Sequence, residues 1–417
     1  MAVPKPEFDA IVIGGGPAGS TTGALLAARG RRVLLLEREP FPRYHIGESL
    51  IPYTWFTLNR LGVLERLRRS AYPKKYSVQF VSITGRVSQP FYFFQTIHHE
   101  CAVTWQVLRS DFDAMLLDNA REKGVDVRQG VAVREMIMDG GRAVGVRADV
   151  RGAGRQELHG KVIVDASGRD AFLCSRFGWK QRDPELNKIA VWSYFKGAKR
   201  DPGLDAAATT VAYVPQKGWF WYIPLPDDVV SVGVVGEPGY LYRDSRDPVV
   251  IFDREANACA WIREHIRPGS RVEPVRVTGE YTYKAREHAG DGFCLVGDAF
   301  AFLDPLFSTG LFLALKSGEM AADAIHEGLE AGDVSASRFA AYGERQRHAV
   351  NSFRHLVAAF YDPTFSFREF LQAYPHLHPL VVDTLVGNVF TDLTPLFGAL
   401  EEYKARATRS EIGATTA

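Results

Sequence analysis

A glycine-rich turn near the N-terminus constrains the fold of this chain more than any other stretch. Residues 9–13 (DAIVI) form an apolar run typical of a buried strand, and residues 14–19 (GGGPAG) follow directly. Small residues through Ala28 then predict a helix, and residues 32–36 (RVLLL) predict a second strand that ends at Glu37. The spacing predicts a complete βαβ unit of the kind that binds a dinucleotide.

Each small residue of this turn has a physical role. Gly14 permits the tight turn, Gly16 lets the backbone approach a pyrophosphate, and Gly19 lets the helix pack closely on the strand. The start of the helix offers free N–H groups and a positive dipole end to the phosphates. Glu37 stands where an acidic side chain can accept both hydroxyls of a ribose. A chance glycine-rich turn would lack these neighbours, so dinucleotide binding is favoured.

Composition sets the broad class. The chain has 417 residues, 46% of them hydrophobic, which suggests about two to three domains or one large cofactor fold. A formal net charge of +1 argues against a nucleic-acid partner. The first ten residues do not resemble a signal peptide, and no uncharged apolar stretch approaches the ~18 residues of a membrane span. Four cysteines without CxxC spacing fit buried thiols, so we expect a cytoplasmic protein.

The chain divides by its hydrophobic patterns. Alternating aromatic and β-branched residues between about 182 and 280 predict an antiparallel sheet, and the residues after Val334 predict helices whose aromatics pack over the substrate region. The predicted strands of that sheet are residues 211–214, 219–223 and 229–235. We expect a mixed α/β (α+β) fold with a cofactor domain at 1–180 and 275–330 and a substrate domain at 181–274. Part of residues 76–105 is expected to contribute to the substrate side, and a helical segment at 331–417 is expected to cover the substrate.

A polar loop at residues 40–52 (PFPRYHIGESLIP) follows the second strand. Leucines along one face of residues 54–70 then predict a single helix that packs on the core. The next basic residues, Lys74 and Lys75, would ordinarily be solvated on composition alone. Residues 98–101 (HHEC) could suggest a metal cluster, but neighbours on a strand point to opposite faces, so we expect no metal site.

Two later strands also end in ligand-binding signals. Residues 161–164 run into Asp165-Ala166-Ser167-Gly168, and residues 293–296 run into Gly297-Asp298, where an aspartate can hold the polyol of a flavin. Arg109 precedes a helix that Ser110 or Asp111 can cap, and it could be a surface charge or a cofactor clamp.

The start of the next helix, at Ser308-Thr309-Gly310, offers amides and a hydroxyl to an anion, with plain N-capping as the alternative. The four consecutive aromatics at residues 219–222 predict at least a packed strand with rings on both faces.

Together the GGGPAG turn with Glu37, Arg109, the turn at Asp165 and the Gly297-Asp298 pair resemble the glutathione-reductase-type FAD fold. That fold occurs in aromatic hydroxylases, geranylgeranyl reductases and flavin-dependent halogenases. Residues 219–224 (WFWYIP) match the WxWxIP motif of the halogenases, and residues 302–310 (FLDPLFSTG) match their FxDPxxSxG motif. Residues 71–76 (AYPKKY) look like their lysine element, although Ala71 and Ser77 replace glycines there.

The resemblance implies a site for FAD, a halide site and a catalytic lysine. The lysine is Lys75, with Lys74 as the alternative; Trp219 and Trp221 would keep organic substrate from the flavin. The implied halide ligands are Ser308, Thr309 and Gly310. The implied cofactor contacts are Gly14, Gly16, Ala18, Gly19, Glu37, Arg43, Ser49, Arg109, Val131, Asp165, Gly168, Gly297, Asp298, Pro305 and Gly310.

The chemistry implied by the resemblance uses FADH2, O2 and chloride or bromide. Hypohalous acid travels to Lys75, which holds it by hydrogen bonding or as a haloamine. Tryptophan halogenases carry a glutamate where this chain has Phe307, so the chain resembles the branch that acts on a phenol or pyrrole, free or bound to a carrier protein. A second GxGxxG unit is missing, which implies a separate flavin reductase.

Three alternatives remain open on sequence alone. The chain could be a geranylgeranyl-type FAD reductase, which needs neither lysine nor halide, or an aromatic monooxygenase, or a flavin-binding module without enzymatic activity.

Overall fold

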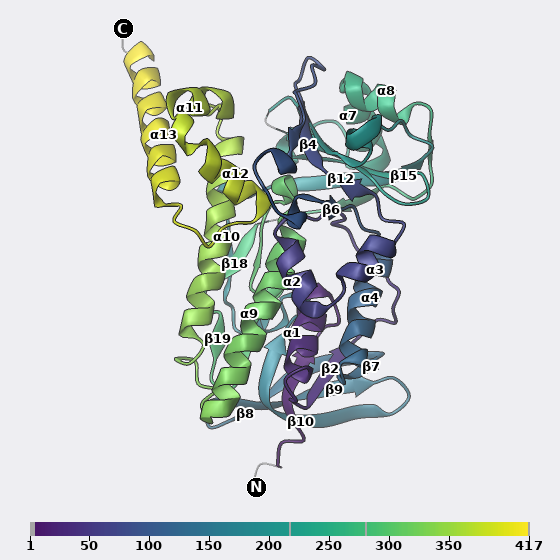
Figure 1. The fold of residues 1–417 in the computed structure, drawn as a ribbon, viewed down its shortest axis with the longest axis vertical. Coiled ribbons are helices and arrows are strands. Elements are labelled where there is room, and N and C mark those ends of the chain that lie inside the picture. The colour runs from purple at the N-terminus through teal and green to yellow at the C-terminus, as the bar shows by residue number, and fades with distance from the viewer. Residues whose placement is uncertain (1–4, 217, 280–281, 416–417) are drawn as a thin grey trace.

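The structure is a computed structural model that describes residues 5–216, 218–279 and 282–415, with side chains described up to Arg406. It contains two large sheets, helices that cover them, and a group of C-terminal helices at one side (Figure 1). Residues 1–4, part of the N-terminal stretch that does not resemble a signal peptide, lie outside the described residues. Among the described residues, no helix is long and apolar enough to cross a membrane.

The first sheet is built around the predicted βαβ unit. Its main order is β19-β20-β10-β1-β2-β7, in which the strands from β20 to β7 run parallel. Its strands are β1 (Phe8–Ile13), β2 (Val33–Glu37), β7 (Asp126–Gln129), β10 (Gly154–Asp165), β19 (Ala289–Gly290) and β20 (Phe293–Leu295). Strand β10 also forms an antiparallel layer with β9 (Arg142–Val150) and β8 (Val131–Asp139).

The helices have the following bounds: α1 Pro17–Ala27, α2 Thr54–Leu61, α3 Leu64–Arg69, α4 Arg109–Glu122, α5 Phe172–Arg176, α6 Pro238–Leu241, α7 Pro248–Ala258, α8 Ala260–Ile266, α9 Gly310–Ala331, α10 Ala340–Tyr361, α11 Phe367–Ala373, α12 His378–Val386 and α13 Thr394–Thr415. Helix α1 packs against α4 and α9 on one face of the first sheet. Alternate residues of β1 explain this layering, because Ala10 and Val12 join the core under the helices while Ile11 and Ile13 face the other side.

The second sheet has the order β16-β12-β15-β14-β13-β4-β5, and β17 also pairs with β12. Its strands are β4 (Ser77–Val81), β5 (Phe91–Tyr92), β12 (Ile189–Lys196), β13 (Thr209–Val214), β14 (Gly218–Pro224), β15 (Val229–Gly236), β16 (Ser270–Arg271) and β17 (Arg276–Thr278). The three strands predicted between residues 211 and 235 are confirmed as antiparallel neighbours β13, β14 and β15.

The consecutive aromatics of β14 divide between the two faces of this sheet. Phe220 and Tyr222 pack under α7 and α8, which cover the outer face. Trp219 and Trp221 join the core on the opposite face, toward the first sheet. The predicted packed strand is confirmed, and its alternation brings both tryptophans to one face.

Two local predictions differ from the structure. The single helix expected over 54–70 is broken at Gly62, which takes a left-handed conformation (φ 77°) and ends α2. Its leucines are nevertheless buried, as predicted. Helix α4 begins at Arg109 itself, with Leu108 at the cap position, so neither Ser110 nor Asp111 caps it.

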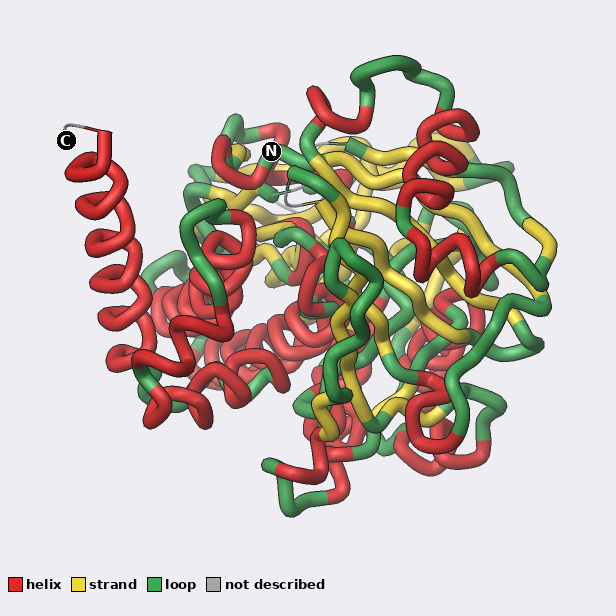
Figure 2. The backbone as a smooth tube through the Cα atoms, turned by 90° about the horizontal axis from the view of Figure 1, so that it is seen from above, coloured by secondary structure: helices red, strands yellow, loops and turns green. Residues whose placement is uncertain are grey.

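Helices α12 and α13 contact α10, and Figure 2 shows α13 at the edge of the molecule. Phe353, Phe360 and Tyr361 of α10 join the large core that contains Trp219. Phe365 and Phe370 instead pack in a separate cluster between α10, α11 and α13, because the chain turns away after α10. The domain boundaries expected at 180, 274 and 330 stay a prediction.

Candidate active site

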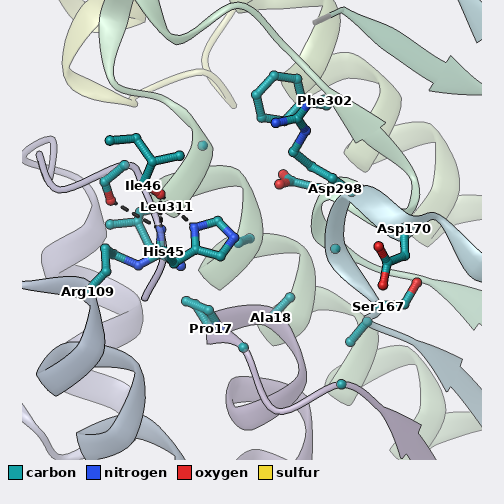
Figure 3. A pocket seen from close by; sticks show the side chains of 18 of the residues that line it. Pro17, Ala18, His45, Ile46, Arg109, Ser167, Asp170, Asp298, Phe302 and Leu311 are labelled. Carbon is teal, nitrogen blue, oxygen red and sulfur yellow. Dashed lines mark hydrogen bonds between the residues drawn. The ribbon is translucent and has the colours of Figure 1, made fainter. Parts of the chain in front are cut away.

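A cavity of about 720 Å³ lies between the two sheets, where β1 and β2 of the first sheet end opposite β14 of the second. Figure 3 shows the start of α1, the loop around His45, and the Asp298 and Ser167 side chains around it. The residues predicted for the site that line the cavity are Gly14, Gly16, Ala18, Glu37, Arg43, Ser49, Arg109, Val131, Gly168, Trp219, Trp221, Asp298, Pro305, Ser308 and Gly310.

The glycine turn brings the backbone to the edge of this cavity. Gly14 has a φ of +107°, and a Cβ there would lie 2.4 Å from the carbonyl oxygen of Ala166. A Cβ on Gly19 would lie 2.0 Å from the carbonyl oxygen of Gly14, so α1 can approach β1 only through glycine. The predicted tight turn and close packing are therefore confirmed as geometry.

Glu37 ends β2 and is buried beside the turn. One carboxylate oxygen accepts a hydrogen bond from the backbone N–H of Gly15 at 2.7 Å, and the other accepts one from Glu39 at 2.8 Å. Each carboxylate oxygen can accept a further bond. Glu37 is thus held in place with acceptor capacity for two hydroxyl groups.

Two arginines meet at Asp113 of α4. The guanidinium of Arg109 donates to both carboxylate oxygens of Asp113, at 2.8 and 2.9 Å, and Arg43 lies 3.3 Å from the same carboxylate. Arg109 also donates to the carbonyl of Ile46 at 2.6 Å (Figure 3). The nitrogen of Arg43 in this ion pair is Nη1, whereas Nη2 lies beside the glycine turn, 3.4 Å from where a Cβ on Gly16 would stand. Arg109 therefore holds the loop, while Arg43 brings positive charge to the glycine turn.

Two aspartates predicted for the cofactor differ in position. Asp165 does not line the cavity, because its carboxylate accepts from the backbone N–H of Ser167 at 3.0 Å and of Leu173 at 2.7 Å. Asp165 instead supports the turn at residues 166–168, which lines the cavity. Asp298 lines the cavity, and burial raises the pKa of its carboxyl to about 6 against the opposing effects of Arg169 and Arg109.

The start of α9 carries the predicted anion site. Ser308 lines the cavity in a left-handed conformation (φ 57°), and Thr309 follows at the cap position of the helix. The Thr309 hydroxyl makes no capping hydrogen bond, and its buried oxygen has no hydrogen-bond partner among the described residues. Side-chain capping is thus not its role here.

Lys75 lies just behind the cavity. It sits in the short strand β3 (Lys74–Lys75), which pairs with β6 (Thr104–Trp105), so Lys74 is exposed while Lys75 is 1% exposed. Nζ of Lys75 donates to the Ser49 hydroxyl at 2.8 Å and to the Leu50 carbonyl at 3.2 Å. Burial lowers the pKa of Lys75 to about 7. The alternation of the strand thus directs Lys75 inward and Lys74 to solvent.

A row of hydroxyl groups joins Lys75 to the cavity wall. The Ser49 hydroxyl lies 3.0 Å from that of Thr209, and both residues line the cavity. Gln106 donates to Thr209 at 2.9 Å and holds it in place. Ser49 therefore contacts the amine of Lys75 and also lines the cavity.

Comparison with known proteins decides the family. A family model described as tryptophan halogenase matches residues 9–104 and 81–368. A 1H-pyrrole-2-carbonyl-(peptidyl-carrier protein) brominase from Pseudoalteromonas luteoviolacea is 35% identical over 333 residues, which cover 78% of this chain and 79% of the relative. The corresponding chlorinase from Pseudomonas fluorescens is 29% identical over 409 residues, covering 92% of this chain and 90% of the relative.

A solved structure agrees with these matches. The flavin-dependent brominase Bmp2 shares 31% sequence identity and a TM-score of 0.86 over 96% of this chain and 99% of that one. The chain belongs to the flavin-dependent halogenase family. The FAD-type α/β fold predicted for this halogenase is confirmed, and the reductase and monooxygenase alternatives are disfavoured.

Five predicted site residues of the halogenase do not line its cavity; they are Gly19, Lys75, Asp165, Gly297 and Thr309. They stand directly behind lining residues. Metal binding has no candidate either, since no group of three His, Cys, Asp or Glu side chains converges among the described residues. Instead of a strand, residues 98–101 lead into a 3-10 helix at Glu100–Ala102, and its cap residue His99 accepts a hydrogen bond from the backbone N–H of Cys101.

The sequence analysis assigned no role to several side chains of the halogenase cavity. Glu48 is buried and accepts a hydrogen bond from the Tyr194 hydroxyl at 2.6 Å, and burial raises the pKa of its carboxyl to about 7. Its place beside Ser49 in a polar loop was the available signal. Thr209 and Trp192 also line the cavity but belong to strands without any motif, so no signal in the sequence points to them.

Proposed function

We propose that this halogenase uses reduced FAD, O2 and chloride or bromide to halogenate an electron-rich aromatic, a pyrrole or a phenol, free or bound to a carrier protein. One FADH2, one O2, one halide ion and one proton together give FAD, water and one hypohalous acid. The hypohalous acid then replaces an aromatic C–H with a carbon–halogen bond and releases water. Lys75 is the residue that delivers the oxidant to the aromatic ring.

The residues of the cavity fit FAD. The turn at Gly14 and Gly16 leaves room for the pyrophosphate at the start of α1, and Glu37 has acceptors for the ribose. The guanidinium of Arg43 lies beside Gly16, where it would face the phosphates. Asp298 reaches into the cavity from the far side, where it would hold the flavin polyol (Figure 3). Bound reduced FAD would supply the electrons for the reaction with O2 and halide.

The halide site we propose is the start of α9. The unpartnered hydroxyl of Thr309 and the N–H groups at Thr309 and Gly310 are donors at the positive end of a long helix dipole. Ser308 and Gly310 line the cavity, so an anion here would lie on the flavin side.

The contact between Lys75 and Ser49 is the observation that carries the proposal. An amine with a pKa of about 7 is divided between charged and neutral forms at neutral pH. The charged form can donate hydrogen bonds to hypohalous acid, and the neutral form can accept the halogen. Trp219 and Trp221 line the cavity beside it and would keep the organic substrate away from the flavin end.

The substrate class rests on the relatives. Two of them are named for a pyrrole-2-carbonyl group on a peptidyl-carrier protein, which one chlorinates and the other brominates. We therefore place a carrier-bound pyrrole first and a free phenol second. Reduced FAD would come from a separate flavin reductase, because a second dinucleotide-binding motif is missing from the sequence.

The test uses the purified protein with FAD, a flavin reductase, NADH, O2 and bromide. Pyrrole-2-carbonyl loaded on a carrier protein, free pyrroles and phenols are offered, and products are read by mass spectrometry. We expect a bromine isotope pattern that disappears in Lys75→Ala and persists in the matched variant Lys74→Ala. Hydroxylated product, or bromination that survives in Lys75→Ala, would contradict the proposal.

A further inference from the structure

A buried chain of three side chains connects the tryptophan wall of the cavity to the loop before α9. The indole N–H of Trp219 donates to the hydroxyl of Tyr361 at 2.7 Å. The Tyr361 hydroxyl donates to Oδ2 of Asp304 at 2.9 Å. Trp219 is 2% exposed, Asp304 is fully buried and Tyr361 is 9% exposed, so all three groups are shielded from water.

The chemistry of the three groups determines which of them donates and which accepts in each hydrogen bond. An indole N–H can only donate, and an ionised carboxylate can only accept. A hydroxyl between them must accept from one and donate to the other, which the Tyr361 phenol does. Phenylalanine at this position would leave the buried indole N–H of Trp219 and one oxygen of Asp304 without these bonds.

The three residues come from three different parts of the fold. Trp219 belongs to β14 of the second sheet, and Asp304 precedes the turn that leads into α9. Tyr361 is the last residue of α10, in the C-terminal part of the chain. Its hydroxyl thus joins three elements that are not neighbours in sequence.

Asp304 organises the loop that carries the proposed halide site. Its other oxygen accepts from the backbone N–H of Leu306 at 3.1 Å, and its own N–H donates to the Thr282 hydroxyl at 3.1 Å. The loop continues through Pro305 and Ser308, which line the cavity. A displacement of Asp304 would therefore move this side of the cavity.

The charges around Tyr361 favour an ionised Asp304. Nζ of Lys188 lies 4.4 Å from the centroid of the Tyr361 ring, and Lys188 is paired with Glu237 at 2.9 Å. Burial raises the pKa of Asp304 to about 6, while Tyr361 and Lys188 act against that rise. At neutral pH the carboxylate is thus mainly charged and accepts from Tyr361.

We infer that Tyr361 is a positioning residue that holds Trp219 and the loop at residues 304–310 in one fixed arrangement, and so determines how much of the oxidant reaches the aromatic substrate. This inference rests on the proposed halogenation and adds the residue that holds Trp219 in its place in the cavity wall. Without the hydroxyl, Trp219 can leave its position beside Trp221, and oxidant escapes from the site.

The first test measures how firmly the indole of Trp219 is held, in the purified full-length protein with FAD. Indole N–H signals are recorded by NMR for the seven tryptophans, and Trp219→Phe assigns the signal of Trp219. In Tyr361→Phe we expect this N–H to exchange with water about tenfold faster, since one buried hydrogen bond is lost. Tyr342→Phe is the matched control, because it removes a buried hydroxyl of the same helix that donates to the Leu295 carbonyl.

The second test measures the fate of the oxidant. The share of consumed NADH recovered as halogenated product should fall about tenfold in Tyr361→Phe, with the remainder recovered as hydrogen peroxide or free hypohalous acid. Tyr342→Phe should stay within about twofold of the wild type. Asp304→Asn serves as a second variant, because its amide cannot accept from both Leu306 and Tyr361. It should lose product in the same direction.

Two results would overturn the inference. One is an exchange rate of the Trp219 N–H in Tyr361→Phe that equals the wild-type rate. The other is faster exchange with an unchanged share of product. If Tyr361→Phe fails to fold, the same two readings on Asp304→Asn decide. If the wild type halogenates nothing, the proposed function fails, and the exchange rate still decides whether Tyr361 holds Trp219.

Discussion

Two buried basic side chains, Arg109 and Lys75, hold the same loop, but their pKa values are shifted in opposite directions. Arg109 donates to the carbonyls of Ile46 and Gly47, and Lys75 donates to the hydroxyl of Ser49 and to the carbonyl of Leu50. Both are nearly inaccessible to water. The loop that follows the second strand of the dinucleotide unit is thus fixed from two sides.

The difference lies in the partners of the two cations. Burial alone would lower the pKa of Arg109, but the carboxylate of Asp113, together with Glu48 and Asp298, outweighs burial and raises the pKa. Among the described residues, Lys75 donates hydrogen bonds only to neutral partners, so burial lowers its pKa to about 7. A paired cation is suited to hold structure at any physiological pH, whereas an unpaired amine is suited to exchange a proton or a halogen.

The largest expected effect comes from removing the partner of the paired cation. Asp113→Ala should lower the free energy of unfolding by about 3–5 kcal/mol, since it leaves Arg109 buried and uncompensated. Urea unfolding measures this. The exposed neighbour Asp111→Ala is the control and should stay within about 0.5 kcal/mol of the wild type. A loss of stability in Asp113→Ala as small as in the control would remove the distinction between the two cations.

A second prediction concerns the pH dependence caused by Lys75. Between its folded pKa of about 7 and its unfolded pKa of about 10.5, the unfolded chain binds more protons, so stability rises with pH. The stability of the wild type relative to Lys75→Met should therefore increase by about 2 kcal/mol from pH 7 to pH 9. Unfolding at a series of pH values measures it, and parallel curves for the two proteins would show that Lys75 stays charged when folded.

The smallest expected effect comes from removing the Ser49 hydroxyl, which accepts a hydrogen bond from Lys75. Ser49→Ala removes an acceptor from the ammonium of Lys75 and should lower its pKa further, by about half a pH unit. The pH profile of bromination should shift to lower pH by the same amount. Thr209→Val is the control, because its hydroxyl contacts Ser49 but not the amine. Identical profiles for Ser49→Ala and the wild type would show that the hydroxyl does not set the charge of Lys75.

Local sequence patterns predicted one part of the site well. The turn at Gly14 and Gly19 and the acid at Glu37 depend on backbone contacts within the first βαβ unit, so spacing alone reveals them. The run of aromatics in β14 predicted rings on both faces, and the structure places the two tryptophans of the motif, Trp219 and Trp221, on the same face.

Other parts of the site depend on contacts that no local pattern encodes. Trp219 and Tyr361 are 142 positions apart, and Ser49 and Thr209 are 160 apart. The helix expected over 54–70 breaks at a single glycine, which the leucine pattern does not reveal. Arg109 could be a surface charge or a clamp from the sequence, and only the position of Asp113 one turn later in α4 shows that it is buried and paired.

By itself, the sequence determined the dinucleotide turn, the mixed α/β fold and the family of this halogenase, because these follow from short motifs and local hydrogen bonds. Only the tertiary structure decided which lysine of the pair turns inward and what state its amine takes. The pKa of Lys75 depends on the removal of water by Ser49, Leu50 and Phe93, which reach it from two other segments. Desolvation is a property of the whole surrounding shell, and no spacing along the chain records it.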